Sequence, residues 1–173
     1  FVPPGSGGLQ IAARLGFRQD GKLYVSTRLG SVNGTLRYDA ATGQFLDVFM
    51  PRGYHLFGPD GFLYSGGPSG SILRSDPVTG ELTGIAVPDG AGIQSPRGMA
   101  FGPDGDIFRV STFSDQVFRY DGETGAFVEH FVPAGGGGLG FPVDLIFADT
   151  LEPVLAGRVV YIDDDLDGRR DPG

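Results

Sequence analysis

The residues with the clearest chemical potential form an acidic stretch near the end of the sequence. Their spacing places carboxylates at positions 1, 3, 5 and 9 of a loop, glycine at position 6 and a backbone carbonyl at position 7, which is the ligand order of a calcium loop. Taken in that order, the residues are Asp163, Asp165, Asp167, Asp171, Gly168 and Arg169. The spacing therefore predicts a calcium site.

A second interpretation of this stretch stays open. A calcium loop also uses a bidentate acid at position 12, which would be residue 174, whereas the chain has 173 residues. We therefore expect this chain to bind calcium weakly. The four aspartates between Asp163 and Asp167 repel one another, and without a cation the stretch would be a solvated acidic loop.

The elements that would position such groups come from an internal repeat. Phe17, Phe57 and Phe101 open three similar stretches, FRQDGKLY, FGPDGFLY and FGPDGDIF, at spacings of 40 and 44 residues. A second shared motif, Asp-x-x-Thr-Gly, begins at Asp39, Asp76 and Asp121. A period in the forties with several short strands per unit predicts the blades of a β-propeller.

Each repeat is expected to contain four short strands. In the clearest copy they are predicted at 99–101, 106–112, 116–120 and 126–132, because apolar and polar residues alternate there and β-branched or aromatic residues are frequent. The glycines of the Asp-Gly and Thr-Gly pairs would supply positive φ at the hairpins, and the aspartate of Asp-x-x-Thr-Gly would cap its turn.

These repeats define the predicted organisation of the chain. We expect an all-β fold, an incomplete or open array of β-propeller blades within residues 1–150, with full units at about 11–49, 53–87 and 97–132 and a partial unit from 142. Residues 1–9 mirror residues 131–139, and both glycine-rich stretches are expected to be flexible linkers. Residues 151–173 would form a junction, with a strand over 157–162, and open a following domain.

Three further candidates lie on predicted first strands, which line the channel of a propeller. His55 precedes the repeated phenylalanine by two residues, and Arg14 and Asp144 precede it by three. Arg14 and Asp144 could face each other across a channel mouth. The alternatives are a structural ion pair and, for His55, an ordinary buried or surface histidine. The phenylalanines Phe113, Phe127 and Phe131 are expected in the core between blades.

Composition limits the classes of function. The net charge is −8 and no Lys/Arg-rich run occurs, which argues against a nucleic-acid partner. No apolar run is long enough for a membrane span, and the absence of cysteine excludes disulfides and thiolate chemistry. The 31 glycines and 13 prolines recur at equivalent turn positions, which indicates turn chemistry and not disorder.

The repeated motif, FGPDG-x-(L/I)-(Y/F) followed by (L/F)-R-Y-D-x-x-T-G, resembles the NHL-like and regucalcin/gluconolactonase-like propeller repeats of secreted bacterial proteins. This resemblance covers residues 1–147. The stretch 157–173 resembles the opening of the SdrD-like B-type repeat of bacterial adhesins. Together they imply an extracellular or cell-surface location, with adjoining domains in a larger chain.

The resemblance implies a fold more firmly than a function. The expected role is a non-catalytic scaffold or recognition module for an unidentified ligand or protein. The alternative is a metal-dependent enzyme acting in the central channel, either a lactonase of the regucalcin type or a lyase. Such lactonases hold the metal through Glu, Asn and Asp, and such lyases use channel histidines, whereas this chain offers one asparagine, Asn33, in a predicted turn and one channel histidine, His55.

Overall fold

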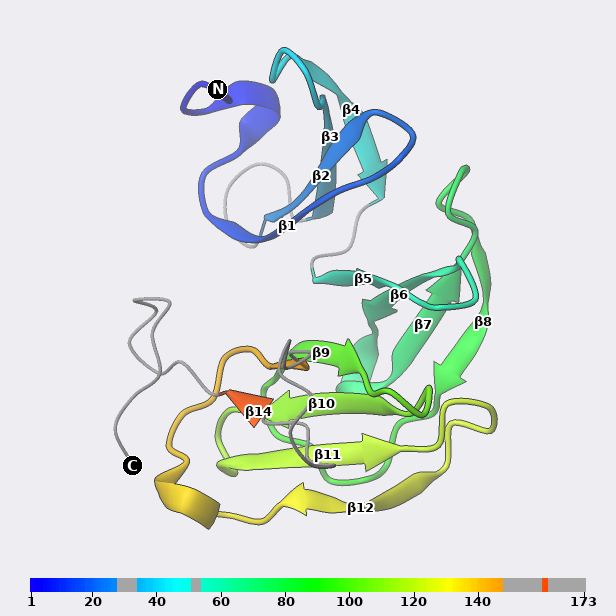
Figure 1. The fold of residues 1–173 in the computed structure, drawn as a ribbon, viewed down its shortest axis with the longest axis vertical. Helices are drawn as coiled ribbons and strands as arrows, with labels where there is room; N and C mark the ends of the chain where they lie inside the picture. Colours follow the sequence, from blue (N-terminus) through cyan, green and yellow to red (C-terminus); the bar gives the residue numbers. More distant parts are fainter. Residues whose placement is uncertain (28–33, 51–53, 148–159, 162–173) are drawn as a thin grey trace, which may run out of the picture. The chain divides into compact units, whose positions relative to one another are not determined.

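The computed structural model describes residues 1–27, 34–50, 54–147 and 160–161 (Figure 1). The elements in this part of the chain are β-strands and three short 3-10 turns. None of its helices is long and apolar enough to cross a membrane. The chain divides into two compact units, one of residues Phe1–Gly67 and Leu73–Gly84 and the other of Pro68–Ile72 and Ile85–Gly173.

Twelve of the strands form three antiparallel sheets of four, each in simple sequence order. The first sheet, blade 1, contains β1 (Ala12–Phe17), β2 (Lys22–Thr27), β3 (Gly34–Asp39) and β4 (Phe45–Met50). The second, blade 2, contains β5 (His55–Phe57), β6 (Leu63–Gly66), β7 (Ile72–Ser75) and β8 (Leu82–Val87). The third, blade 3, contains β9 (Pro96–Phe101), β10 (Ile107–Ser111), β11 (Gln116–Tyr120) and β12 (Phe127–Val132). The predicted all-β array of three full blades is therefore confirmed.

A short further sheet follows blade 3. It pairs β13 (Ile146–Phe147) with β14 (Val160–Tyr161), so the partial fourth repeat has a first strand as predicted. The proposed domain boundary near residue 150 stays a prediction.

Burial differs between the inner and outer strands of a blade. In blade 3, every residue of β10 is buried, whereas five of the six residues of β12 are exposed. β10 has a neighbour on each side and packs through both faces, whereas β12 is the outer strand of its sheet. The phenylalanines expected in the core between blades are exposed instead, and that prediction was wrong for Phe113, Phe127 and Phe131. Phe113 lies in a loop, and the other two lie on the outer strand β12.

Each blade has two different ends, because its strands alternate in direction. The hairpins that join its first to its second strand and its third to its fourth strand lie at one end, which we call the turn end. The connection between the second and third strands, and the linker to the next blade, lie at the other end, which we call the loop end.

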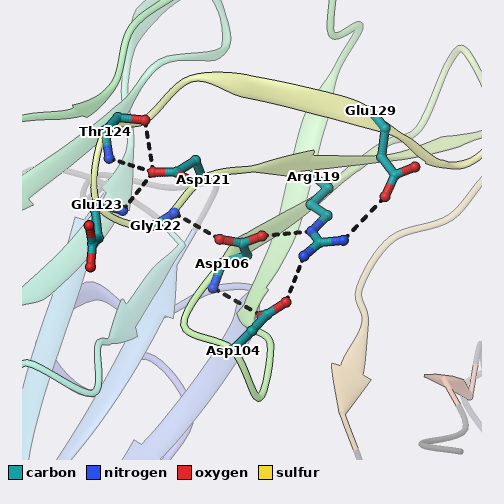
Figure 2. Close-up of polar contacts among 8 residues, drawn as sticks. All are labelled: Asp104, Asp106, Arg119, Asp121, Gly122, Glu123, Thr124 and Glu129. Atoms are coloured by element: carbon teal, nitrogen blue, oxygen red, sulfur yellow. Dashed lines mark hydrogen bonds and ion pairs between the residues drawn. The ribbon is translucent and has the colours of Figure 1, made fainter.

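The turn ends follow the sequence prediction closely. In the turn between β11 and β12, Asp121 Oδ1 accepts hydrogen bonds from the backbone N–H groups of Glu123 and Thr124, at 3.1 and 2.7 Å, and from the Thr124 hydroxyl at 2.7 Å (Figure 2). Gly125 then takes a φ of 71°. The same turns begin at Asp39 and Asp76. The predicted capping role of these aspartates is confirmed.

The two glycine-rich linkers fold alike. Turns η1 (Ser6–Gly8) and η3 (Gly136–Gly138) have matching backbone angles, with φ of 63° at Gly7 and 65° at Gly137. Each ends in a leucine that joins a hydrophobic core, Leu9 in blade 1 and Leu139 in blade 3. Repeated glycines at fixed positions therefore encode one specific turn.

Candidate functional site

The loop ends carry an unusual concentration of backbone strain. In the described part of the chain, every non-glycine residue with positive φ lies at a loop end, with φ between 37° and 55°. These residues are Tyr54, Ser69, Ser95, Asp115 and Phe141. Positive φ at the turn ends, in contrast, belongs to glycines alone among the described residues. Strain of about 1–3 kcal/mol per residue persists only where the surroundings hold it, and it concentrates at functional sites.

Hydrogen bonds hold the loop end of blade 3 in this conformation. The Ser111 hydroxyl bonds both the N–H and the carbonyl of Gln94, at 2.8 and 2.9 Å. The Thr112 hydroxyl donates to the carbonyl of Pro142 at 2.8 Å. The N–H of Phe141 donates to Asp115 Oδ1 at 2.6 Å. Three segments distant in sequence, around residues 94, 113 and 141, are therefore tied together.

An exposed aromatic pair lies on this bonded frame. The rings of Phe113 and Phe141 have centroids 5.8 Å apart and planes inclined by 42°. Their exposed fractions are 65% and 58%. Two large apolar rings held in water by strained, hydrogen-bonded backbone are poorly explained by folding alone, because exposure forfeits their contribution to stability. The pair is the candidate functional site.

A buried arginine supports the loop end of the same unit. Arg109 on β10 is 2% exposed, and its Nη1 donates to the carbonyls of Gly70 and Ser71 at 2.9 and 2.8 Å. Burial lowers the pKa of Arg109 to about 10, and its Nε has no hydrogen-bond partner among the described residues. Valine and serine, Val25 and Ser65, occupy the equivalent positions of the other blades. An arginine at a position where the other repeats have valine and serine was the sequence signal that this residue has a role of its own.

The predicted channel residue His55 lies inside the first unit. It is 3% exposed, and its Nδ1 lies 2.7 Å from the Ser26 hydroxyl and 3.0 Å from the Thr35 hydroxyl. Burial chiefly, and the positive charge of Arg14 secondarily, lower the pKa of His55 to about 4. The imidazole is therefore uncharged at neutral pH and packs against the ring of Tyr24. A role for His55 in chemistry at a channel mouth stays a prediction.

The other predicted site residues fall in separate places. Arg14 is on β1 in the first unit, and Asp144 precedes β13 in the second, where it lies close to Gly98. Their pairing stays a prediction. Asn33 and the calcium-loop residues Asp163, Asp165, Asp167, Arg169 and Asp171 lie outside the described residues. Within the residues that the structure describes, no group of three or more His, Asp or Glu side chains is arranged to hold a metal ion.

A charged cluster near the turn end of blade 3 has a structural explanation. Arg119 bonds Asp106 at 2.6 Å, Asp104 at 2.7 Å and Glu129 at 3.3 Å (Figure 2). The corresponding aspartates of the other blades, Asp20 and Asp60, accept a hydrogen bond from a tyrosine hydroxyl. Phenylalanine replaces that tyrosine in blade 3, where Asp104 keeps the arginine contact that Asp60 of blade 2 also makes, with Arg74 at 2.9 Å.

Sequence reasoning missed the aromatic pair. Its signal was present at Phe113, which follows the second strand of blade 3 at a place where blade 2 has glycine and proline. The partnership with Phe141 depends on a contact between residues far apart in the sequence, which no local pattern reveals.

Comparisons with known proteins give the fold. No family model matches the sequence, and no curated protein matches it. Streptogramin B lyase has a similar structure, with a TM-score of 0.54 and 17% sequence identity over 80% of this chain and 47% of that one. Regucalcin, a calcium-binding protein from Agrobacterium tumefaciens, has a TM-score of 0.49 and 22% sequence identity over 78% of this chain and 49% of that one. The WD40 repeats of RRP9 have a TM-score of 0.46 and 17% sequence identity over 72% of this chain and 42% of that one.

This chain thus spans about half the length, or less, of the structures it resembles. The likeness to streptogramin B lyase, together with the three four-stranded sheets, shows that the chain is built of β-propeller blades.

Proposed function

We propose that this chain is a non-catalytic recognition module that binds its ligand at the loop end of blade 3. The observation that carries the proposal is the exposed pair of Phe113 and Phe141, fixed by strained backbone and by the bond from Phe141 N–H to Asp115. A rigid apolar surface binds with little loss of conformational entropy, because it is ordered before the ligand arrives. The surrounding loops supply polar groups that orient a ligand.

The proposed setting is a larger secreted or cell-surface bacterial protein. The motif resemblance supports that setting. The alternative remains a metal-dependent lactonase or lyase. The environment of His55 favours recognition over this alternative, since a buried, uncharged imidazole bonded to two hydroxyls is shielded from substrate.

Calcium at the acidic loop is a second part of the proposal, supported by the spacing from Asp163 to Asp171. Isothermal titration of the chain with calcium chloride is expected to give weak binding heat, and the double variant Asp165→Ala, Asp167→Ala is expected to abolish it, because it removes two ligands. Equal heat in both proteins, or none in either, would remove calcium from the account.

The loop-end site is tested by NMR with two probe mixtures, one of neutral oligosaccharides and one of short peptides. Recognition at the proposed site predicts that one mixture shifts the aromatic signals of Phe113 and Phe141 and the amide signals of residues 112–116. Phe17, which is exposed on β1, serves as the internal control and should not respond. Shifts confined to turn ends, or no shifts with either mixture, would contradict the proposal.

A further inference from the structure

We infer that the ligand of the aromatic pair is a neutral carbohydrate, a chain of pyranose sugars with equatorial hydroxyl groups. This inference rests on the proposed function and names the ligand class of that same site. Three features of the loop end carry it: the geometry of the two rings, the polar groups beside them, and the charge of the chain.

The geometry of the rings suits a saturated sugar ring. Phe113 and Phe141 are inclined by 42° with centroids 5.8 Å apart, so their faces are not closed against each other in a parallel stack. The face of an aromatic ring carries partial negative charge and attracts the weakly positive C–H groups of a neighbour. A pyranose with equatorial hydroxyls presents C–H groups on both of its faces, and it can therefore lie against such rings.

Polar side chains follow Phe113 directly along the chain. They are Ser114, Asp115 and Gln116, and all are partly exposed. Asp115 uses Oδ1 for Phe141 N–H, and its Oδ2 accepts no other hydrogen bond among the described residues. A carboxylate oxygen accepts from a sugar hydroxyl, and glutamine both donates and accepts. The Ser114 hydroxyl donates to Ser111 Oγ and can accept a hydrogen bond from the sugar. The equatorial rim of a sugar would meet these groups while its face meets the rings.

Charge separates this ligand class from others that stack on aromatic rings. Single-stranded nucleic acids also stack on such side chains, but they need a positively charged groove. The chain has a net charge of −8, and Asp115 places a carboxylate at the rings themselves. A neutral ligand pays no electrostatic penalty here. A proline-rich peptide, which also docks on aromatic surfaces, is the competing class that the experiment must separate.

The test is isothermal titration of the chain with cellotetraose, chitotetraose and maltotetraose, and with a decaproline peptide. At least one tetrasaccharide is expected to bind, and Phe113→Ala and Phe141→Ala are each expected to weaken it by about tenfold. The control variant Phe17→Ala, which removes an exposed phenylalanine from β1, should bind unchanged. Urea unfolding of each variant verifies that the fold is retained.

Each other outcome overturns the inference. Tetrasaccharide binding that survives both substitutions in folded protein would place the sugar elsewhere. Decaproline binding that depends on Phe113, without sugar binding, would overturn the carbohydrate class and leave recognition at the loop end standing. Failure of all four probes, together with silence of the Phe113 and Phe141 signals in the NMR test, would overturn both proposals.

Discussion

At the scale of single residues, His55 couples the stability of the first unit to pH. Its folded pKa of about 4 lies below the ordinary value of 6.5, because burial disfavours the charged imidazole. Between these values, the unfolded chain binds a proton that the folded chain excludes. The stabilisation is therefore complete above pH 6.5 and is lost as the pH falls toward 4.

We accordingly predict that the free energy of unfolding drops by about 3 kcal/mol over this window through His55 alone. The measurement is urea unfolding at a series of pH values for the unchanged chain and for His55→Gln, whose profile should be flatter by that amount. His130→Gln, which alters an exposed histidine on β12, is the matched control substitution. An unaltered pH profile in His55→Gln would refute the assigned environment.

How well single residues could be predicted depended on how far apart in the sequence their interaction partners lie. The turn at Asp121 was predictable because its acceptor and donors lie within three positions. The exposure of Phe113 was not, because it depends on how residues 94 and 141 approach the loop after β10. Likewise, the buried hydrogen bonds of His55 reach back 29 residues to Ser26.

At the scale of elements, the two hairpins of blade 3 each contain a glycine with positive φ, but the surroundings of these glycines differ. Gly105 and Gly125 both have positive φ, 89° and 71°, at turns of blade 3. A side chain at Gly105 would meet open space, whereas a Cβ at Gly125 would overlap the carbonyl oxygen of Ala86 at the end of the preceding blade. A glycine with positive φ therefore has a packing role in one turn and none in the other.

This difference predicts unequal costs for the same substitution. Gly105→Ala should lower the free energy of unfolding by about 1–2 kcal/mol, from the left-handed conformation alone. Gly125→Ala adds a steric clash with backbone and should cost at least about 3 kcal/mol. Both costs are measured by urea unfolding of the whole chain carrying each substitution. Equal losses would show that the turn at Gly125 does not contact Ala86 on β8.

Most strands and turns were predicted closely because each is encoded by a short pattern that occurs three times. β11 was predicted at its observed bounds, β10 is one residue shorter at each end, β12 begins one residue later, and β9 begins three residues earlier than predicted. The linkers were harder, since glycine composition alone indicates flexibility. Leu9 and Leu139 anchor the linkers in hydrophobic cores. This role depends on tertiary packing and could not be predicted from the linker composition.

At the scale of the whole molecule, one kind of contact recurs within each unit: a residue of, or next to, a first strand packs on the blade before it. Leu145, beside β13, is 2% exposed and joins the core of blade 3 with Phe108 and Val110. His55 on β5 is inserted in the same way beside Ser26 and Thr35 of blade 1. Leu15 on β1 occupies the equivalent position and is 61% exposed.

The contrast between these two leucines is tested most directly by comparing the unfolding free energies of Leu15→Ala and Leu145→Ala, each against the unchanged chain. Because Leu145 is buried in a core, its truncation should cost about 2–5 kcal/mol. Leu15 is largely in water, and its truncation should change stability by less than about 0.5 kcal/mol. That inequality is the predicted result. A loss at Leu15 as large as the loss at Leu145 would show that β1 is covered in solution and would contradict the exposed position of Leu15.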